Sequence, residues 1–183
     1  MKLILALILT TCLFVSCQKT QDPFEISKQH IGSLTDSTQV KDLKMVFIND
    51  SIHRFESTNT FGTNASDIEI YDSGGKQLLV LTPSQKSDST ATIKSIKVVD
   101  ARFKTSKGLN AHSTFKDIKA NYTISGIQNT LRHIIVSVNE INAYFTIEKT
   151  ELPSELRFDM TVKIEALQIP DNAQIKNFFV QWL

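Results

Sequence analysis

The chain has 183 residues, with 20 lysines and arginines against 19 aspartates and glutamates, so its net charge is +1. Lys2 is the one charged residue in the segment 1–16. Without this segment, 19 basic residues face 19 acidic residues, and the net charge is zero. This balance argues against nucleic acid as a partner, because nucleic-acid binding requires clustered positive charge. Hydrophobic residues make up 41% of the chain, including 11 phenylalanines, which is enough for a substantial core.

The chain opens with a basic residue and a short apolar run. Lys2 is followed by mostly apolar residues from Leu3 to Val15, and then by the small residue Ser16. Thirteen helical residues rise roughly 20 Å, which is short of the ~30 Å hydrocarbon core of a bilayer. The layout is that of a secretory signal peptide over residues 1–16.

Phe14-Val15-Ser16-Cys17 resembles the lipobox of bacterial lipoproteins, although Phe14 stands where that family usually has Leu. The resemblance implies that the leader is cut before Cys17, and that its thiol and new amino group carry acyl chains. The alternative is an ordinary secretory signal in which Cys17 has no role. The rest of the mature chain has no cysteine, and a lone thiol in an exported protein favours a use for it. We therefore expect Cys17 to be a lipid anchor, since more than one acyl chain gives stable attachment.

Residues 17–23 read as a lipidated tether, because no apolar residue occurs between Cys17 and Pro23. In lipoproteins of enteric-type bacteria, Asp directly after the lipidated Cys retains the protein in the inner membrane. Gln18 in that position implies the outer membrane of a Gram-negative bacterium. Gln18-Lys19 also half matches a surface-export tag, so the periplasmic face and the cell surface both remain open.

Residues 24–183 are expected to form one domain with an internal duplication. Val40-Lys-Asp-Leu-Lys44 aligns with Phe115-Lys-Asp-Ile-Lys119 at an offset of 75 residues, each after a Gly and a Ser-Thr pair. The apolar spacing predicts a short helix over 40–47 and another over 115–122. Ser37 or Thr38 would cap the first, and Ser113 or Thr114 the second. We place the first repeat at about 24–91 and the second at about 92–183.

The remaining elements are predicted to be strands. Asp67–Asp72 and Lys76–Leu81 flank the turn residues Ser73-Gly74-Gly75 and predict a hairpin. Further strands are expected over 93–103, over 133–148 in two pieces that turn near Asn139–Asn142, and at the C-terminus through Trp182. Leu156–Glu165 shows the clearest alternation, typical of a half-buried antiparallel strand. Polar segments 56–66 and 83–92 are expected to be loops.

This order of elements predicts an α+β fold, with an antiparallel sheet packed against two short helices. The duplicated Gly, hydroxyl, short helix and following strands resemble the tandem-repeat fold of β-lactamase inhibitory protein. They also resemble small lipoproteins of outer-membrane assembly. The likeness covers roughly 30 residues of each repeat, and no functional residue is transferred from it.

Ser113 and Lys116 have the S-x-x-K spacing that places Lys one helical turn after the nucleophilic Ser of β-lactamases. The partner motifs are missing, because Lys104-Thr105-Ser106 has Ser where K-T-G requires Gly. We therefore predict that Ser113 caps the helix and that Lys116 faces solvent. No catalytic residue is assigned.

Other candidate sites are weak. His30, His53, His112 and His133 have no metal-binding spacing, so neither a metal site nor a cofactor is expected. Asp67 and Glu69 would share one face of a strand, either paired for acid–base chemistry or exposed to solvent, and we expect the second. Trp182 with Phe178 and Phe179 would be either an interface anchor or part of the core, and we expect the core.

Three function classes follow. The first is a lipid-anchored binding or accessory protein of the cell envelope, without catalysis, that contacts the membrane through Cys17 and another envelope protein through its sheet and polar loops. The second is a small envelope hydrolase or transferase, which requires Ser113, His112 or His133, and a carboxylate in one cleft. The third is a carrier of an apolar ligand, which requires an apolar cavity of about 300 Å³ or more. The first is our prediction.

Overall fold

The computed structural model describes residues 22–54 and 66–182. Residues 1–21, with the predicted signal peptide and Cys17, lie outside that range, and so does most of the predicted loop over 56–66. Within the described residues, no helix has the length and hydropathy to cross a membrane.

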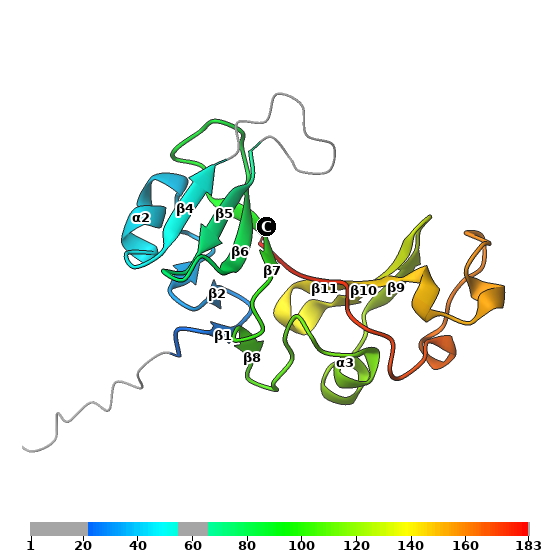
Figure 1. Ribbon diagram of the computed structural model, residues 1–183. Coiled ribbons are helices and arrows are strands. Elements are labelled where there is room, and N and C mark those ends of the chain that lie inside the picture. Colours follow the sequence, from blue (N-terminus) through cyan, green and yellow to red (C-terminus); the bar gives the residue numbers. More distant parts are fainter. Residues whose placement is uncertain (1–21, 55–65, 183) are drawn as a thin grey trace, which may run out of the picture.

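One large antiparallel sheet runs through the molecule (Figure 1). Its eight strands follow the spatial order β4-β5-β6-β7-β12-β11-β10-β9. Their bounds are β4 Ser51–Arg54, β5 Ile68–Tyr71, β6 Gln77–Pro83, β7 Ile93–Val98, β9 Gly126–Asn129, β10 His133–Val138, β11 Ala143–Glu148 and β12 Asn177–Gln181. Each half is a four-stranded meander, and the two meanders join where β7 pairs with β12.

A second, smaller sheet holds the N-terminal residues of the described domain. It has the order β3-β2-β1-β8, with strands of two residues each: β1 Glu25–Ile26, β2 His30–Ile31, β3 Leu34–Thr35 and β8 Lys104–Thr105. Its β1–β8 pair is parallel, and the other pairs are antiparallel. The tight turn after β2 depends on Gly32, whose φ is +55° and where a Cβ would lie 2.2 Å from the Pro23 carbonyl oxygen.

Each meander is preceded by a short helical segment. The first begins as the 3-10 helix η2 Val40–Asp42 and continues as α2 Leu43–Val46, while the second is α3 Phe115–Asn121. Thr114 and Asp117 form a capping box at α3, in which the Thr114 N–H donates to Asp117 Oδ2 at 2.7 Å. This confirms the predicted hydroxyl cap of α3. The predicted cap of the first helix is wrong, because Gln39 stands at its start and no side-chain hydrogen bond caps it.

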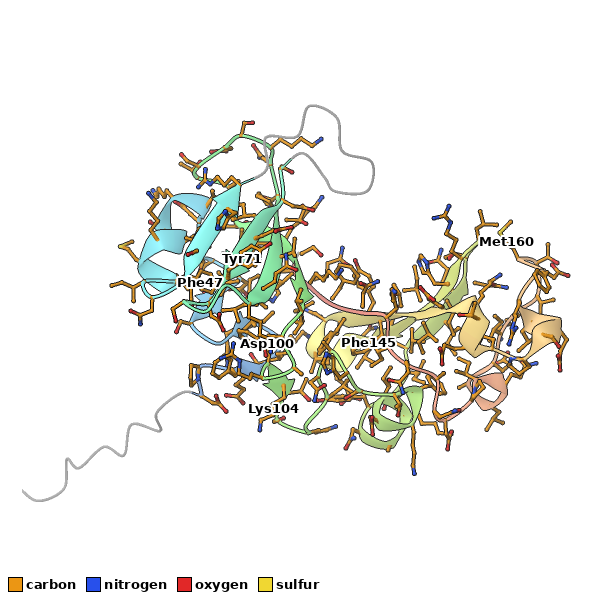
Figure 2. All side chains as sticks on the ribbon, in the orientation of Figure 1. Phe47, Tyr71, Asp100, Lys104, Phe145 and Met160 are labelled. Carbon is orange, nitrogen blue, oxygen red and sulfur yellow. The ribbon has the colours of Figure 1, made fainter. Side chains whose placement is uncertain are left out.

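One continuous core lies under the large sheet, on the face covered by the helices and the small sheet. The strand register aligns one apolar residue from every strand into a row: Ile52, Ile70, Leu79, Val98, Phe178, Phe145, Val136 and Ile127. Phe115 of α3 packs into this core and is fully buried, as are Phe145 and Phe178. Figure 2 shows the Phe145 side chain between the sheet and α3. Burial of this row sets the register, since a slip by one residue would turn it to the other face.

The predicted hairpins are confirmed, and one predicted strand is shorter than expected. The turn between β10 and β11 contains the 3-10 helix η3 Asn139–Ile141 and Asn142 in the left-handed region, as the sequence predicted for 139–142. The strand expected over 93–103 ends at Val98, because Asp100 bends the chain by accepting a hydrogen bond from the Arg102 N–H at 2.8 Å.

The strand predicted over Leu156–Glu165 is wrong. The chain there leaves the 3-10 helix η5 Ser154–Leu156, bends through residues without regular structure and enters η6 Ala166–Gln168. Asp159 accepts hydrogen bonds from the Thr161 N–H and hydroxyl at 2.8 and 2.6 Å, which closes a local turn in place of a strand. Phe158, which would lie on the apolar face of the predicted half-buried strand, is 88% exposed.

The fold is therefore α+β in the broad sense: mostly antiparallel sheet with short helices on one side. A further 3-10 helix, η4 Lys149–Glu151, follows β11. The strand β7, which we assigned to the second repeat, pairs with β6 of the first meander and with β12 of the second.

Candidate functional site

Within residues 22–54 and 66–182, no helix covers one face of the large sheet, and this face is the candidate binding site. α2 lies outside the β4–β5 end of the sheet, and α3 lies below the β9–β11 end (Figure 1). The two halves meet at an angle near β7, and the face without helices is on the inside of that angle (Figure 1). We call it the open face.

The register places a second row of residues across the open face, one from each strand. In spatial order they are His53, Glu69, Val80, Lys97, Phe179, Tyr144, Ser137 and Gly126. Most of them are half-buried, whereas the residues of the opposite row are almost all buried. The open face is thus polar at both ends and aromatic in the middle.

Phe179 and Tyr144 form an aromatic pair at the centre of this row. Their rings stack with centroids 4.8 Å apart and an interplanar angle of 12°. Burial raises the pKa of the Tyr144 hydroxyl above its ordinary value, and a hydrogen bond with Ser95 opposes that rise. Both rings are half-buried. A flat, rigid aromatic surface that keeps a polar group is the kind of contact enriched in protein interfaces.

A second group of side chains lies on the open face near the β4 edge. The His53 and Tyr71 rings meet edge to face, with centroids 5.2 Å apart. The Tyr71 hydroxyl donates to Glu69, and this hydrogen bond raises the pKa of Tyr71. Asp67 does not pair with Glu69 for acid–base chemistry. It accepts from the Thr82 hydroxyl at 2.8 Å, while Glu69 is engaged with Tyr71.

The S-x-x-K residues lie in a helix-start turn. Ser113 is buried, and its hydroxyl oxygen accepts from the Asn110 N–H at 3.1 Å. The prediction that Ser113 caps the helix is wrong, because Thr114 occupies the N-cap position of α3. Lys116 is exposed, as predicted.

His112, Ser113 and Asp117 line one polar hollow of about 350 Å³ beside α3. Ser113 and Asp117 are not hydrogen-bonded to each other in this hollow, because Ser113 is hydrogen-bonded to Asn110 and Asp117 is hydrogen-bonded to Thr114. Among the described residues, no hydrogen bond joins the His112 ring to either of them. His133 begins β10 and does not line this hollow. A nucleophile, a base and an orienting carboxylate are therefore not assembled here.

The four histidines are dispersed over different elements: His30 in β2, His53 in β4, His133 in β10 and His112 before α3. In the ranges 22–54 and 66–182, no three His, Cys, Asp or Glu residues are grouped so as to hold a metal ion.

The C-terminal aromatic residues divide between the two faces of the sheet. Phe178 is fully buried, and Trp182 is 5% exposed with its Nε1–H donating to the Lys28 carbonyl oxygen at 3.0 Å. These two residues belong to the core, as predicted. Phe179 belongs to the open face, so the core prediction is wrong for this residue.

Several hollows bear on the hypothesis of an apolar carrier. A hollow of about 410 Å³ lies between α2 and β4, and Val40, Leu43 and Ile52 are its apolar lining residues. Lys41, Lys44 and Arg54 also line it, so it is open and cationic. The hollow beside α3 is polar. Neither is the closed apolar cavity that a carrier requires.

Comparison with known proteins gives a fold neighbour. No protein family model matches the chain, and no curated protein sequence matches it. The chain is similar in structure to the uncharacterized protein yfeY from Escherichia coli, solved by crystallography, with a TM-score of 0.54 and 16% identity. The match covers 86% of this chain and 99% of that one. At this identity the likeness establishes a shared fold and no activity.

Proposed function

We propose that this protein is a lipid-anchored binding or accessory protein of the cell envelope, which acts without catalysis through the open face of its sheet. The anchor is Cys17, and the partner is another envelope protein. The observation that carries the proposal is the stacked Tyr144–Phe179 pair at the centre of a sheet face without helices.

Two observations support a binding role over an enzymatic one, and the proposed anchor is consistent with it. The S-x-x-K serine and the nearby histidine are not hydrogen-bonded into a catalytic arrangement. The open face has a large aromatic surface at its centre and polar residues around it, which matches the core and rim of protein interfaces. The lipid anchor would confine the domain to a membrane surface and raise the effective concentration of a partner in the same membrane.

The proposal includes an internal duplication of the domain. Its support is that both halves run from a short helix into a four-stranded antiparallel meander, at the helix offset of 75 residues seen in the sequence. On this view the open face is built from two related halves, with the aromatic pair entirely on the second.

Quantitative affinity capture from detergent-solubilised envelopes tests the binding role. The bait is the full-length protein, compared with a Tyr144→Ala/Phe179→Ala variant and with Leu167→Ala as the control. Leu167 is 98% exposed and lies outside the open face. We expect one or more partners to be recovered with the wild type and the control, and to be lost with the double variant. Equal recovery with all three baits would contradict the proposal.

Metabolic labelling with a fatty acid tests the anchor. Wild-type protein should incorporate the label, and the Cys17→Ala variant should not. Protease treatment of intact cells then distinguishes the surface from the periplasmic face. A Cys17→Ala variant that stays labelled would show that the anchor is elsewhere or absent.

A further inference from the structure

One exposed surface next to α2 combines lysines with large apolar side chains. Met45 is 71% exposed and Ile48 is 79% exposed, and the exposed Lys41 and Lys44 precede them on the same helical segment. Lys41 lies in η2, Lys44 and Met45 lie in α2, and Ile48 lies in the turn that follows α2. We call these four residues the α2 tip.

The α2 tip carries two lysine charges. Among residues 22–54 and 66–182, no salt bridge involves Lys41 or Lys44. The neighbouring carboxylates, Asp42 and Asp50, are half-buried, so the outward surface of this segment is cationic and apolar. Arg54 adds a third cation at the hollow between α2 and β4.

The tether leaves the domain beside this surface. Pro23 and Phe24, where the described chain begins, line the same hollow of about 160 Å³ as Val46 and Phe47 at the end of α2. Six residue steps separate Pro23 from Cys17, and an extended chain spans at most ~3.5 Å per residue. A lipid on Cys17 therefore keeps Pro23, and with it the end of α2, within roughly 20 Å of the membrane.

We infer that the α2 tip is a membrane-contact surface, which binds the anionic headgroups of the bilayer into which the Cys17 lipid inserts. Lys41 and Lys44 face the phosphates, while Met45 and Ile48 enter the headgroup region. Apolar side chains flanked by lysines are the pattern of interfacial membrane binding. The inference rests on the proposed anchor, and it adds a second attachment that fixes the orientation of the domain.

Spin labels on single cysteines test this contact in the full-length lipidated protein. The mature chain has no cysteine besides Cys17, whose thiol the lipid occupies, so an introduced cysteine is the one reactive thiol. Met45→Cys places the label on the α2 tip. Leu131→Cys is a matched control, because Leu131 is also 71% exposed and lies in the turn between β9 and β10.

The labelled proteins are reconstituted into phosphatidylglycerol-containing vesicles, and label collisions with oxygen and with a water-soluble nickel chelate are measured. We expect the Met45 label to gain oxygen access and lose chelate access, while the Leu131 label stays open to the chelate. Each lysine near an anionic leaflet raises the equilibrium constant for membrane contact about fivefold. The double variant Lys41→Gln/Lys44→Gln should therefore lower this constant roughly 30-fold.

The outcomes separate the contact from the anchor. Flotation with the vesicles, together with equal chelate access at both labels, would overturn the membrane contact and leave the anchor intact. A different outcome is that, in micelles, the Met45 label becomes more shielded as the protein concentration rises. That result would mean that the α2 tip binds a second copy of the chain, and it would also overturn the membrane contact. Failure to float would overturn both proposals.

Discussion

Replacement of Asp100 by Asn should destabilise the domain strongly, and in a way that depends on pH. The Asp100 side chain is fully buried, and its carboxylate accepts hydrogen bonds from the Arg102 side chain at 2.9 and 3.1 Å. It also forms a salt bridge of 2.9 Å with Lys76. Arg102 continues to Asp72 at 2.8 Å, so the network joins the β5–β6 turn to the bend after β7. In Figure 2, Asp100 lies near the middle of the molecule.

The expected loss is about 3 kcal/mol at neutral pH. Removal of one partner from a buried ion pair costs about 3–5 kcal/mol, and the lower end applies because Lys76 and Arg102 are 64% and 45% exposed. For a domain of this length the melting temperature should fall by roughly 6–12 °C. Asp88→Asn is the control, because Asp88 accepts from Thr90 in a surface loop and should cost about 1 kcal/mol or less.

The pH dependence identifies the charge as the cause. Hydrogen bonds and the nearby cations hold the pKa of Asp100 well below its ordinary value despite burial. A carboxyl with a lowered folded-state pKa stabilises the fold above its unfolded pKa of about 3.9, and this contribution is lost as the pH falls toward the folded value. At pH 2.5 the difference between wild type and Asp100→Asn should therefore be smaller than at pH 7.

Urea denaturation followed by fluorescence of the buried Trp182, at pH 7 and at pH 2.5, measures both quantities. If Asp100→Asn and Asp88→Asn destabilise equally, the buried network does not carry the stability that we assign to it. A difference between Asp100→Asn and wild type that is the same at both pH values would show that the charge of Asp100 is not responsible.

Four more substitutions test particular features by the same denaturation assay. Thr114→Ala should cost about 1 kcal/mol by removing the α3 cap, and no loss of stability would contradict the capping box. Phe178→Ala should lower the free energy of unfolding by about 3–5 kcal/mol, and Phe179→Ala should lower it by clearly less, because the first ring is fully buried and the second is half-buried. Equal losses would contradict the assignment of the two residues to opposite faces of the sheet. Phe158→Ser should change the free energy of unfolding by less than about 0.5 kcal/mol, because the Phe158 side chain is exposed. If residues 156–165 formed a strand with Phe158 in the core, the loss would be several kcal/mol.

Strands with a repeated pattern and a clear turn could be predicted from the sequence. The β5–β6 hairpin has short apolar segments on both sides of the turn residues Gly74 and Gly75, and β10 and β11 flank the turn at Asn142. The strands β1, β2 and β3 could not be predicted, because two residues contain no period. They form because long-range packing holds them, and Ile26, Ile31 and Leu34 are all buried.

The wrongly predicted strand over 156–165 shows that a local turn can form in a segment whose apolar residues alternate. Residues 156–165 alternate well, yet the hydrogen bonds of Asp159 to Thr161 commit the chain to a bend. A second contact holds the segment in place, because the Asn129 side chain donates to the carbonyl oxygens of Asp159 and Val162 at 3.0 and 2.9 Å. Asn129 is 30 residues earlier in the sequence, so a local reading gives no sign of it.

The candidate site could not be predicted from the sequence for a different reason. Tyr144 and Phe179 belong to strands that are far apart in the sequence, and each alternates with a core phenylalanine next to it. Sequence periodicity indicates two faces for each strand, but it does not indicate which strands are neighbours. The pair becomes visible when the register of β11 with β12 is known.

The position of β12 has a consequence for how this chain reaches its native state. The last strand of the sequence lies in the middle of the large sheet, between β7 and β11, so neither meander can complete its hydrogen bonds until the C-terminus arrives. Contacts of such long sequence separation form slowly, since loop closure must precede them. A chain translocated N-terminus first would thus stay incompletely folded until its final residues emerge. Loss of those few residues would leave two unpaired strand edges at the centre of the molecule, which are sites for aggregation.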